Sequence, residues 1–212
     1  MVRDWVHLGA LLGVLLGGFL TYRWWRGSRT ASESIPAISI VALRSEESST
    51  HGRDPLPAIR EPRVVIRKSL RRLDLLDGNT GVRSYPIALG VHPVGDKERE
   101  GDGRTPEGTL YVCTRNDRSR FHLFLGLSYP SLAQAHRGLS EGLIDGAQYE
   151  AVRKAHGARD CPPWNTPLGG AVGIHGGGVH GDWTVGCIAL ANEHIEELWS
   201  VLRLGDPVQI VP

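Results

Sequence analysis

The sequence predicts a mainly β fold with a few short helices at its periphery. Its 212 residues include 27 glycines and 13 prolines, a content that favours a turn-rich chain over a helical bundle. The apolar residues occur in short runs bounded by turn residues, as in β-strands. The length corresponds to one domain with an appendage, and it allows a sizeable core without covalent cross-links.

The appendage is the apolar segment at the N-terminus. No Asp, Glu, Lys or Arg occurs from Trp5 to Tyr22, and residues 8–20 are all Leu, Gly, Ala, Val or Phe. That stretch is shorter than the roughly 20 residues of a membrane span, but interfacial aromatic residues extend it at both ends. Arg and Trp fill positions 23–26, where a cleavage site would fall. We predict an uncleaved signal-anchor, a membrane helix within residues 1–27, with a cleaved signal or a buried helix as alternatives.

A linker and one folded domain follow this segment. Residues 28–62 are rich in Ser, Glu, Pro and Arg and cannot bury enough surface to fold alone, so we predict a flexible linker. The folded domain is expected over residues 63–212. The chain holds 24 basic and 23 acidic residues, a balance that gives no sign of a nucleic-acid partner. Because Arg23, Arg26 and Arg29 follow the apolar segment, the positive-inside rule alone would keep the domain in the cytoplasm.

Each strand of the domain is expected at an apolar run. Asp77-Gly78-Asn79 is a hairpin-type turn, so the runs on either side of it are expected to pair. The expected strands, in chain order, cover residues 64–66, 73–76, 82–89, 109–113, 121–127, 172–174, 187–190 and 208–211.

Helices are expected at two places on this β scaffold. Residues 131–156 change to helical spacing and predict two short helices, the second closed by Gly157. Near the C-terminus, Asn192 is expected to cap a helix that Gly205 ends. The apolar residues of that helix follow the i, i+3, i+4, i+7 spacing and are Ile195, Leu198, Trp199 and Leu202.

The densest group of chemically useful residues lies between Ile174 and Leu190. Five glycines there surround His175, His180, Asp182 and Cys187. A catalytic thiol needs a base or cation to activate it and a pair of backbone N–H groups to receive an oxyanion. The backbone around Cys187 offers such N–H groups, and His175 offers the imidazole.

Other interpretations of the same residues stay open. A cysteine in an apolar run is often a buried small hydrophobic residue, and a histidine beside glycine often lies in a turn. A zinc site from His175, His180 and Cys187 is conceivable, but its gaps match no common zinc-finger spacing. Cys113 and Cys161 either pair in an oxidising compartment or stay as buried thiols.

Three segments carry a resemblance to a known family. Residues 101–108 read Gly-Asp-Gly-Arg-Thr-Pro-Glu-Gly, residues 167–170 read Pro-Leu-Gly-Gly, and residues 184–188 read Thr-Val-Gly-Cys-Ile. In this order they resemble the signatures of the L,D-transpeptidase (YkuD-type) catalytic domain. The resemblance covers residues 63–212 and implies an L,D-transpeptidase-like, mixed β-sandwich domain.

The resemblance also implies roles for individual residues. Cys187 would be the nucleophile, His175 its general base, and the Gly176 carbonyl the group that orients His175. The N–H groups of Gly186 and Cys187 would form the oxyanion hole. No metal or organic cofactor is implied. Residues expected to bind substrate, or to shape or support its cleft, are Arg104, Thr105, Trp164, Asp182, Trp183 and Thr184. For some of these a plain role stays open, a turn for Asp182 and Trp183 and simple packing for Trp164.

The implied function is that of a peptidoglycan L,D-transpeptidase. Such an enzyme forms a Cys thioester with a stem tetrapeptide and passes the acyl group to an amine, on a second stem or on a lipoprotein lysine. Here Val185 stands where the family usually has His, and residues 182–190 resemble a branch that includes enzymes detaching a lipoprotein from peptidoglycan. The alternatives are therefore an L,D-carboxypeptidase or hydrolase that cleaves stem-peptide or lipoprotein linkages, and a non-catalytic wall-binding module. All of these place the domain at the extracytoplasmic face of the cytoplasmic membrane, in the periplasm, anchored or secreted.

Overall fold

The computed structural model describes residues 54–212. The predicted signal-anchor (1–27) and most of the predicted linker (28–53) lie outside the described residues. Among the described residues, no helix has both the length and the apolar character needed to cross a membrane. The last part of the predicted linker contacts the domain, because Leu56 and Ile59 pack against its core.

Eight strands form one continuous sheet in the order β3-β2-β1-β8-β4-β5-β6-β7. This confirms the mainly β fold class. The mixed β-sandwich that the resemblance implies takes the form of a single sheet that curls around the core. The strands, in chain order, are β1 (Pro62–Arg67), β2 (Arg72–Asp77), β3 (Thr80–Pro86), β4 (Gly108–Ser119), β5 (His122–Leu127), β6 (Gly173–His175), β7 (Ile188–Ala189) and β8 (Pro207–Val211).

The long strand β4 makes the curl possible. Its first half, Gly108–Tyr111, pairs with β8, and its second half, from Val112 on, pairs with β5 through two register shifts. Such irregularities bend a strand and increase its twist. The two ends of the sheet are then bridged by the chain after β3, where Ala88 and Ala189 exchange hydrogen bonds of 2.9 and 2.8 Å. The predicted strand over residues 82–89 therefore ends early, at Pro86, and continues only as isolated bridges.

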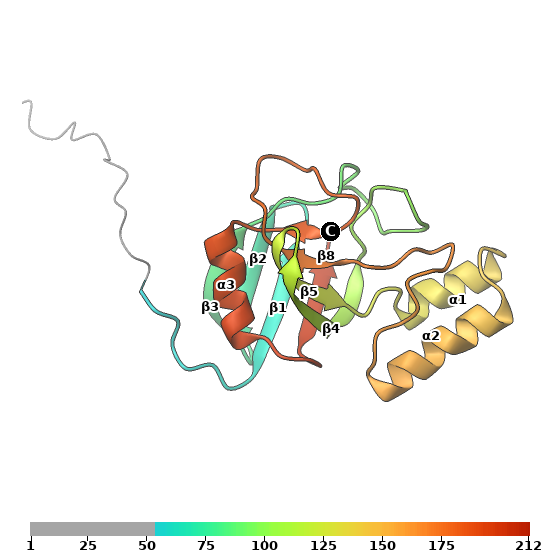
Figure 1. Cartoon of the computed structure of the whole chain (residues 1–212), viewed down its shortest axis with the longest axis horizontal. Coiled ribbons are helices and arrows are strands. Elements are labelled where there is room, and N and C mark those ends of the chain that lie inside the picture. Colours follow the sequence, from blue (N-terminus) through green and yellow to red (C-terminus); the bar gives the residue numbers. More distant parts are fainter. Residues whose placement is uncertain (1–53) are drawn as a thin grey trace, which may run out of the picture. The chain divides into compact units, whose positions relative to one another are not determined.

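The core fills the inside of the curl and is closed by helix α3 (Asn192–Val201). Ile195 and Leu198 of α3 are fully buried, as the helical spacing predicts. Each such side chain stabilises the fold by about 1.5–3 kcal/mol relative to an exposed one. Because α3 contacts β5 (Figure 1) and also β6, it fixes the strand that ends in His175.

The start and end of α3 differ from the prediction. Ala191 is the N-cap residue, and Asn192 makes no side-chain capping bond. Its Oδ1 instead accepts a hydrogen bond of 2.9 Å from the N–H of Gly177. The helix ends at Val201, so Gly205, with φ of 93°, lies in the following turn. Asn192 thus ties the start of the helix to the loop after β6.

The helices α1 (Leu132–Ser140) and α2 (Gly146–Ala158) lie side by side at the periphery, as predicted (Figure 1). Each begins with a capping box, in which the side chains of the N-cap residue and of a Gln three positions later bond each other's backbone N–H. The pair has a small core of its own, formed by Ala135, Ile144, Val152 and Leu168. Gly157 does not end α2: the helix runs one residue further, and Arg159 ends it in a left-handed conformation.

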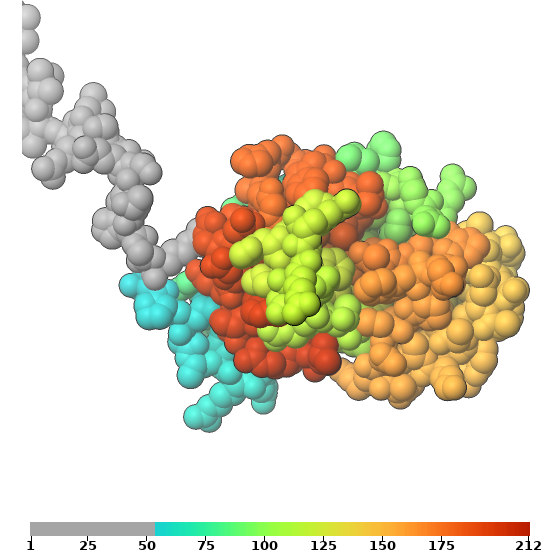
Figure 2. Space-filling view, viewed as in Figure 1, coloured from blue at the N-terminus to red at the C-terminus, as the bar shows by residue number. Residues whose placement is uncertain are grey.

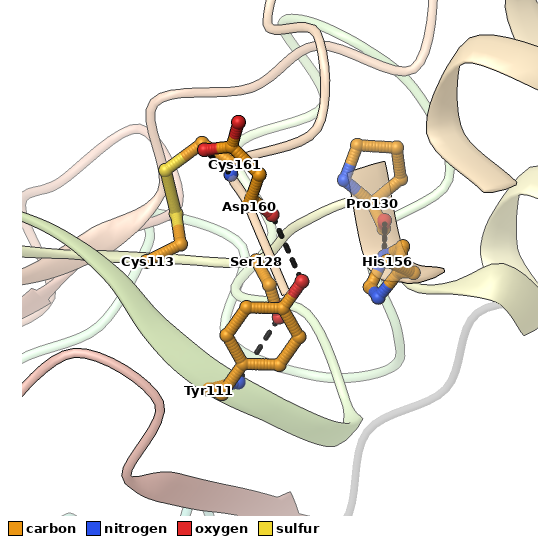
Figure 3. Close-up of a disulfide and its surroundings, with 7 residues drawn as sticks. All are labelled: Tyr111, Cys113, Ser128, Pro130, His156, Asp160 and Cys161. Carbon is orange, nitrogen blue, oxygen red and sulfur yellow. Dashed lines mark hydrogen bonds between the residues drawn. A yellow bond between two sulfur atoms is a disulfide. The ribbon is translucent and has the colours of Figure 1, made fainter. Parts of the chain in front are cut away.

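A disulfide joins β4 to the segment that follows α2. Cys113 and Cys161 are bonded, with their Cα atoms 5.1 Å apart, which resolves the two alternatives that the sequence left open. Close by, the hydroxyl of Tyr111 donates a hydrogen bond of 2.8 Å to the carbonyl of Asp160 (Figure 3). The cross-link therefore anchors residues 159–172, the segment that leads into β6, on the sheet.

Candidate active site

Cys187 lies directly before β7, at a cavity of about 350 Å³. Among the described cysteines it is the one free thiol. Its Sγ contacts the carbonyl of Ala171 at 3.5 Å. Burial raises the pKa of the Cys187 thiol above its ordinary value, although a backbone hydrogen bond with Gly173 and the charge of Lys97 act in the opposite direction. The thiol is therefore protonated at rest and needs a base to become a nucleophile.

His175 is the last residue of β6 and is only 2% exposed. Its Nδ1 lies 2.6 Å from the carbonyl oxygen of Gly176. A carbonyl only accepts hydrogen bonds, so Nδ1 carries the proton and Nε2 has the free lone pair. Burial lowers the pKa of His175 below 6.5 despite the bond to Gly176, so the neutral imidazole is favoured. The predicted contact between His175 and the Gly176 carbonyl is present.

The sheet places His175 and Cys187 on the same face. Strands β6 and β7 are parallel, and His175 pairs with Ala189. Side chains two positions apart on an extended chain point to the same side, so Cys187 shares the face of Ala189 and His175. The imidazole and the thiol, twelve residues apart in sequence, thus come from β6 and from the residue directly before the adjacent β7.

Two aromatic rings enclose the imidazole of His175. Phe121 stacks on it with ring centres 4.6 Å apart, and Trp183 meets it edge-on at 5.6 Å. Phe121 lies in the turn of the β4–β5 hairpin, which forms part of the molecular surface (yellow-green in Figure 2). This hairpin therefore shields His175 from water and contributes to the low pKa of its imidazole.

Replacing Phe121 with Ala is expected to raise the pKa of His175 toward its ordinary value of 6.5. The reason is that water would reach a ring whose charged form burial now disfavours. The imidazole NMR signals followed through a pH titration measure this pKa. Phe124→Ala is the matched control, because that ring lies farther away, at 6.5 Å, and should shift the pKa less. An unchanged or lower pKa in the Phe121 variant would show that the hairpin does not desolvate His175.

Two buried threonines form hydrogen bonds with the backbone at Cys187. Thr184 donates a hydrogen bond of 2.7 Å to the Cys187 carbonyl and accepts one of 3.2 Å from the N–H of Gly186. Thr105 donates to the same carbonyl at 3.4 Å and accepts from Gly90 at 3.0 Å. Thr184 was expected to bind substrate and Thr105 to shape the cleft or its support, and in the structure both hydroxyls bond the backbone carbonyl of Cys187. The N–H of Gly186, expected as an oxyanion donor, is engaged by Thr184.

The other residues expected in the cleft lie in three different places. Trp164 lines the Cys187 cavity. Arg104 lines a neighbouring cavity of about 580 Å³ and forms an ion pair with Glu98 at 2.9 Å. Asp182 accepts hydrogen bonds from the guanidinium of Arg71 and from the N–H of Leu89, so its carboxylate fixes the loop to the sheet.

Sequence reasoning missed two residues of the site. Phe121 sits in an ordinary hairpin turn, and Lys97 stands in a run of charged residues that resembles a solvated loop. Lys97 is instead only 3% exposed and lines the Cys187 cavity. Neither has a local signal, since both contacts depend on distant parts of the chain. Within residues 54–212, no three His, Cys, Asp or Glu side chains are grouped to hold a metal ion.

Comparison with known proteins adds a family assignment to this geometry. The family model described as the L,D-transpeptidase catalytic domain (YkuD) matches residues 61–210. No curated protein sequence matches the chain.

Solved structures with a similar fold come from several bacteria. Bd1075 of Bdellovibrio bacteriovorus is 17% identical, with a TM-score of 0.48, over 74% of this chain and 50% of that one. The cell-shape-determining protein Pgp2 of Campylobacter jejuni is 20% identical, with a TM-score of 0.49, over 74% and 49%. An L,D-transpeptidase of Xylanimonas cellulosilytica is 16% identical, with a TM-score of 0.43, over 74% and 64%. The chain thus spans about half to just under two thirds of these structures.

Proposed function

The chain belongs to the L,D-transpeptidase catalytic domain family, and from this premise we propose that it is a peptidoglycan L,D-transpeptidase that works through a thioester on Cys187. Its acyl donor is a stem tetrapeptide. Its acceptor is an amine, on a second stem peptide or on a lipoprotein lysine.

One observation carries the proposal. The imidazole of His175 is buried, keeps its Nδ1 proton on the Gly176 carbonyl and lies on the strand next to the one that follows Cys187. The raised pKa of the thiol and the lowered pKa of the imidazole describe a neutral pair at rest. Such a pair suits a general base that removes the thiol proton as the substrate is attacked.

The first step forms the thioester. The Nε2 of His175 takes the thiol proton while Sγ of Cys187 attacks the carbonyl at the L-centre of the diamino acid. The S–C bond forms, the C–N bond to the terminal D-Ala breaks, and the imidazolium returns its proton to the leaving amine. D-Ala departs with its amine intact, and the base is neutral again.

The second step releases the enzyme. An acceptor amine attacks the thioester carbonyl, and His175 takes a proton from it. The new C–N bond forms, the S–C bond breaks, and the thiolate of Cys187 recovers the proton. In both steps the negative oxygen that forms on the carbonyl needs donors, which we assign to the N–H groups of Cys187 and Gly186. The second donor becomes available when the long Gly186–Thr184 hydrogen bond of 3.2 Å opens.

Replacing Gly186 with Ala is expected to lower the rate of acyl transfer about 100-fold, because small displacements of catalytic groups have effects of that size. Gly186 has a φ of +138°, and a Cβ there would lie 2.8 Å from the carbonyl oxygen of Arg104. Gly181→Ala is the matched control: its φ is +94°, but its Cβ would meet open space. Both variants carry strain from a positive φ, about 1–2 kcal/mol, and Gly186→Ala adds the contact with Arg104, so thermal unfolding should report the larger loss for Gly186→Ala. Equal rates of acyl transfer in the two variants would show that Gly186 does not contribute to the oxyanion hole.

Hydrolysis is the second candidate function, and Val185 favours it. This side chain is 78% exposed at the mouth of the Cys187 cavity, at the position where the family usually has His. The site therefore lacks one donor that would hold an acceptor. With water as the acceptor, the same thioester would lead to cleavage of stem peptides or of peptidoglycan–lipoprotein linkages.

The disulfide supports an extracytoplasmic location. Bonds such as Cys113–Cys161 persist in oxidising compartments such as the bacterial periplasm. Peptidoglycan is also found outside the cytoplasmic membrane. We therefore assign the domain to that side, with residues 1–27 as its export signal or anchor in spite of the arginines that follow them.

Product analysis tests the function. The full chain is incubated with sacculi, and the muropeptides are identified by mass spectrometry. New 3–3 cross-links support transfer, and loss of stem-peptide or lipoprotein linkages supports hydrolysis. Labelling with a carbapenem-type probe separates both from a wall-binding module, because only an enzyme should form an adduct at Cys187. Unchanged muropeptides without an adduct would refute the proposal.

A further inference from the structure

Lys97 is a buried cation in the wall of the Cys187 cavity. Its stem passes Gly186, where a Cβ would lie 3.9 Å from Cδ of Lys97. Its Nζ donates to Asp102 Oδ1 at 2.6 Å and to the carbonyl of Arg99 at 2.9 Å. The ring centre of Tyr129 lies 6.0 Å away on another side. Among the described residues, two acceptors thus take two of the three N–H groups, and one N–H remains for a ligand.

The remainder of the cavity wall explains why this charge matters. Of the side chains described there, Lys97 is the one cation, and glycines, Ala171, Val172, Val185 and Trp164 supply much of the other surface. The one carboxylate, that of Glu100, belongs to an exposed residue. A cation away from bulk water interacts with an anion more strongly than an exposed cation does. An acyl donor that enters this cavity therefore meets an ammonium beside the thiol. Asp102 balances part of the ammonium's charge, and the third N–H of Lys97 can donate to the acyl donor.

We propose that Lys97 is a specificity-determining residue, which binds a carboxylate of the acyl donor while Cys187 attacks the neighbouring carbonyl. The inference deepens the proposed function and rests on it for the identity of the donor. A stem tetrapeptide has two carboxylates close to the reacting bond, one on the terminal D-residue and one on the side chain of a diamino acid such as diaminopimelate. Either one would satisfy the free N–H of Lys97.

Asp102 holds the ammonium of Lys97 in place and stays ionised by itself. Its carboxylate accepts hydrogen bonds from the backbone N–H groups of Glu98, Arg99 and Arg104. Burial raises the pKa of Asp102, but the bonds from Lys97 and from these N–H groups outweigh it and lower the pKa below its ordinary value. Removing the lysine charge therefore leaves a carboxylate that still has three donors, so Lys97→Met is expected to fold.

Substrate analogues distinguish the two possible carboxylates. Two stem tetrapeptides are compared with the free acid, one amidated at the terminal carboxylate and one at the side-chain carboxylate. For the wild-type chain, amidation of the recognised group should lower kcat/KM about tenfold or more, since a hydrogen bond between charged groups has that effect. In Lys97→Met the same amidation should have little effect. If neither amide is a poorer substrate than the acid, Lys97 does not recognise a carboxylate of the donor.

Alkylation tests the charge selectivity without requiring any activity on peptidoglycan. Iodoacetate and iodoacetamide have nearly the same size, and each transfers its carbon to the thiolate with loss of iodide. Because Cys187 is the free thiol and the other two cysteines are bonded, the label reports on this site. The ratio of the two rate constants cancels the thiolate fraction, so a change in the pKa of Cys187 does not affect it.

The ratio compared is that of the alkylation rate constants for iodoacetate and iodoacetamide, normalised to the same ratio for glutathione. This ratio should be about tenfold or more higher in the wild-type chain than in Lys97→Met. Lys97→Arg should keep most of the preference for the anion. If Lys97→Met alone is unfolded in a thermal scan, the double variant Lys97→Met with Asp102→Asn is used in its place, because it removes both buried charges together. An equal ratio in wild type and in the folded variant would overturn the proposal, whatever the outcome with muropeptides.

Discussion

Replacing Cys187 with Ala is expected to lower the processing of muropeptides by at least about 10⁴-fold. Removal of a nucleophile from a Ser-His-Asp protease has an effect of that order or larger, because the covalent pathway is lost. In this chain the disulfide holds the other two cysteines, so no second thiol among the described residues can take over. The measurement is the rate at which terminal D-Ala is released from stem tetrapeptides by the full chain.

The control for this variant is a neighbour that shares the cavity but not the chemistry. Val185→Ala changes an exposed side chain two positions before Cys187 and should keep the activity within a few-fold. Both variants should unfold at nearly the wild-type temperature, because neither removes a large buried side chain. Unchanged release of D-Ala in the Cys187 variant would rule out the thioester mechanism.

Most strands were predictable because their signals are local. The runs at 73–76 and 82–89 flank the turn at Gly78, and the structure pairs them as the hairpin β2–β3. The run Val64–Ile66 forms β1, which pairs with the other side of β2. The curl of the sheet was not predictable in this way. It depends on register shifts within β4 and on the bridge between Ala88 and Ala189, which are about a hundred positions apart.

The residues of the candidate site also differ in whether a local sequence signal marks them. Cys187 and His175 were candidates because they lie in one short glycine-rich stretch, and the family resemblance assigned their roles and that of Gly176. Asn192 is of a residue type that often caps helices. Its side-chain Oδ1 instead accepts a hydrogen bond from the N–H of Gly177, so a tertiary contact overrides the capping propensity. Lys97 reaches the cavity only because a loop folds it inward against Asp102. A pattern search assigns residue types to local structure, and it cannot detect such placements.

Removing the disulfide is expected to lower the free energy of unfolding by about 4 kcal/mol. Cys113 and Cys161 are 48 positions apart, and a cross-link that closes a loop of this length restricts the unfolded chain by about that amount. Urea unfolding of Cys113→Ser with Cys161→Ser measures the loss. Adding a reductant to the wild-type chain should reproduce it, and the double variant should not respond to the reductant. A loss below about 1 kcal/mol would mean that the cross-link adds little beyond the packing around it.

The same variant should also weaken the active site, because the disulfide anchors one wall of the cavity. The segment after Cys161 supplies Trp164, Gly170 and Ala171 to that wall, and the Ala171 carbonyl contacts the thiol of Cys187. Without the anchor, amide hydrogen exchange over residues 159–172 should accelerate more than exchange in β1 and β2. Iodoacetamide labelling of Cys187 should change in parallel, because its surroundings loosen. If labelling stays constant while stability falls, the cavity wall is held by its own packing, and the disulfide serves only the global stability of the domain.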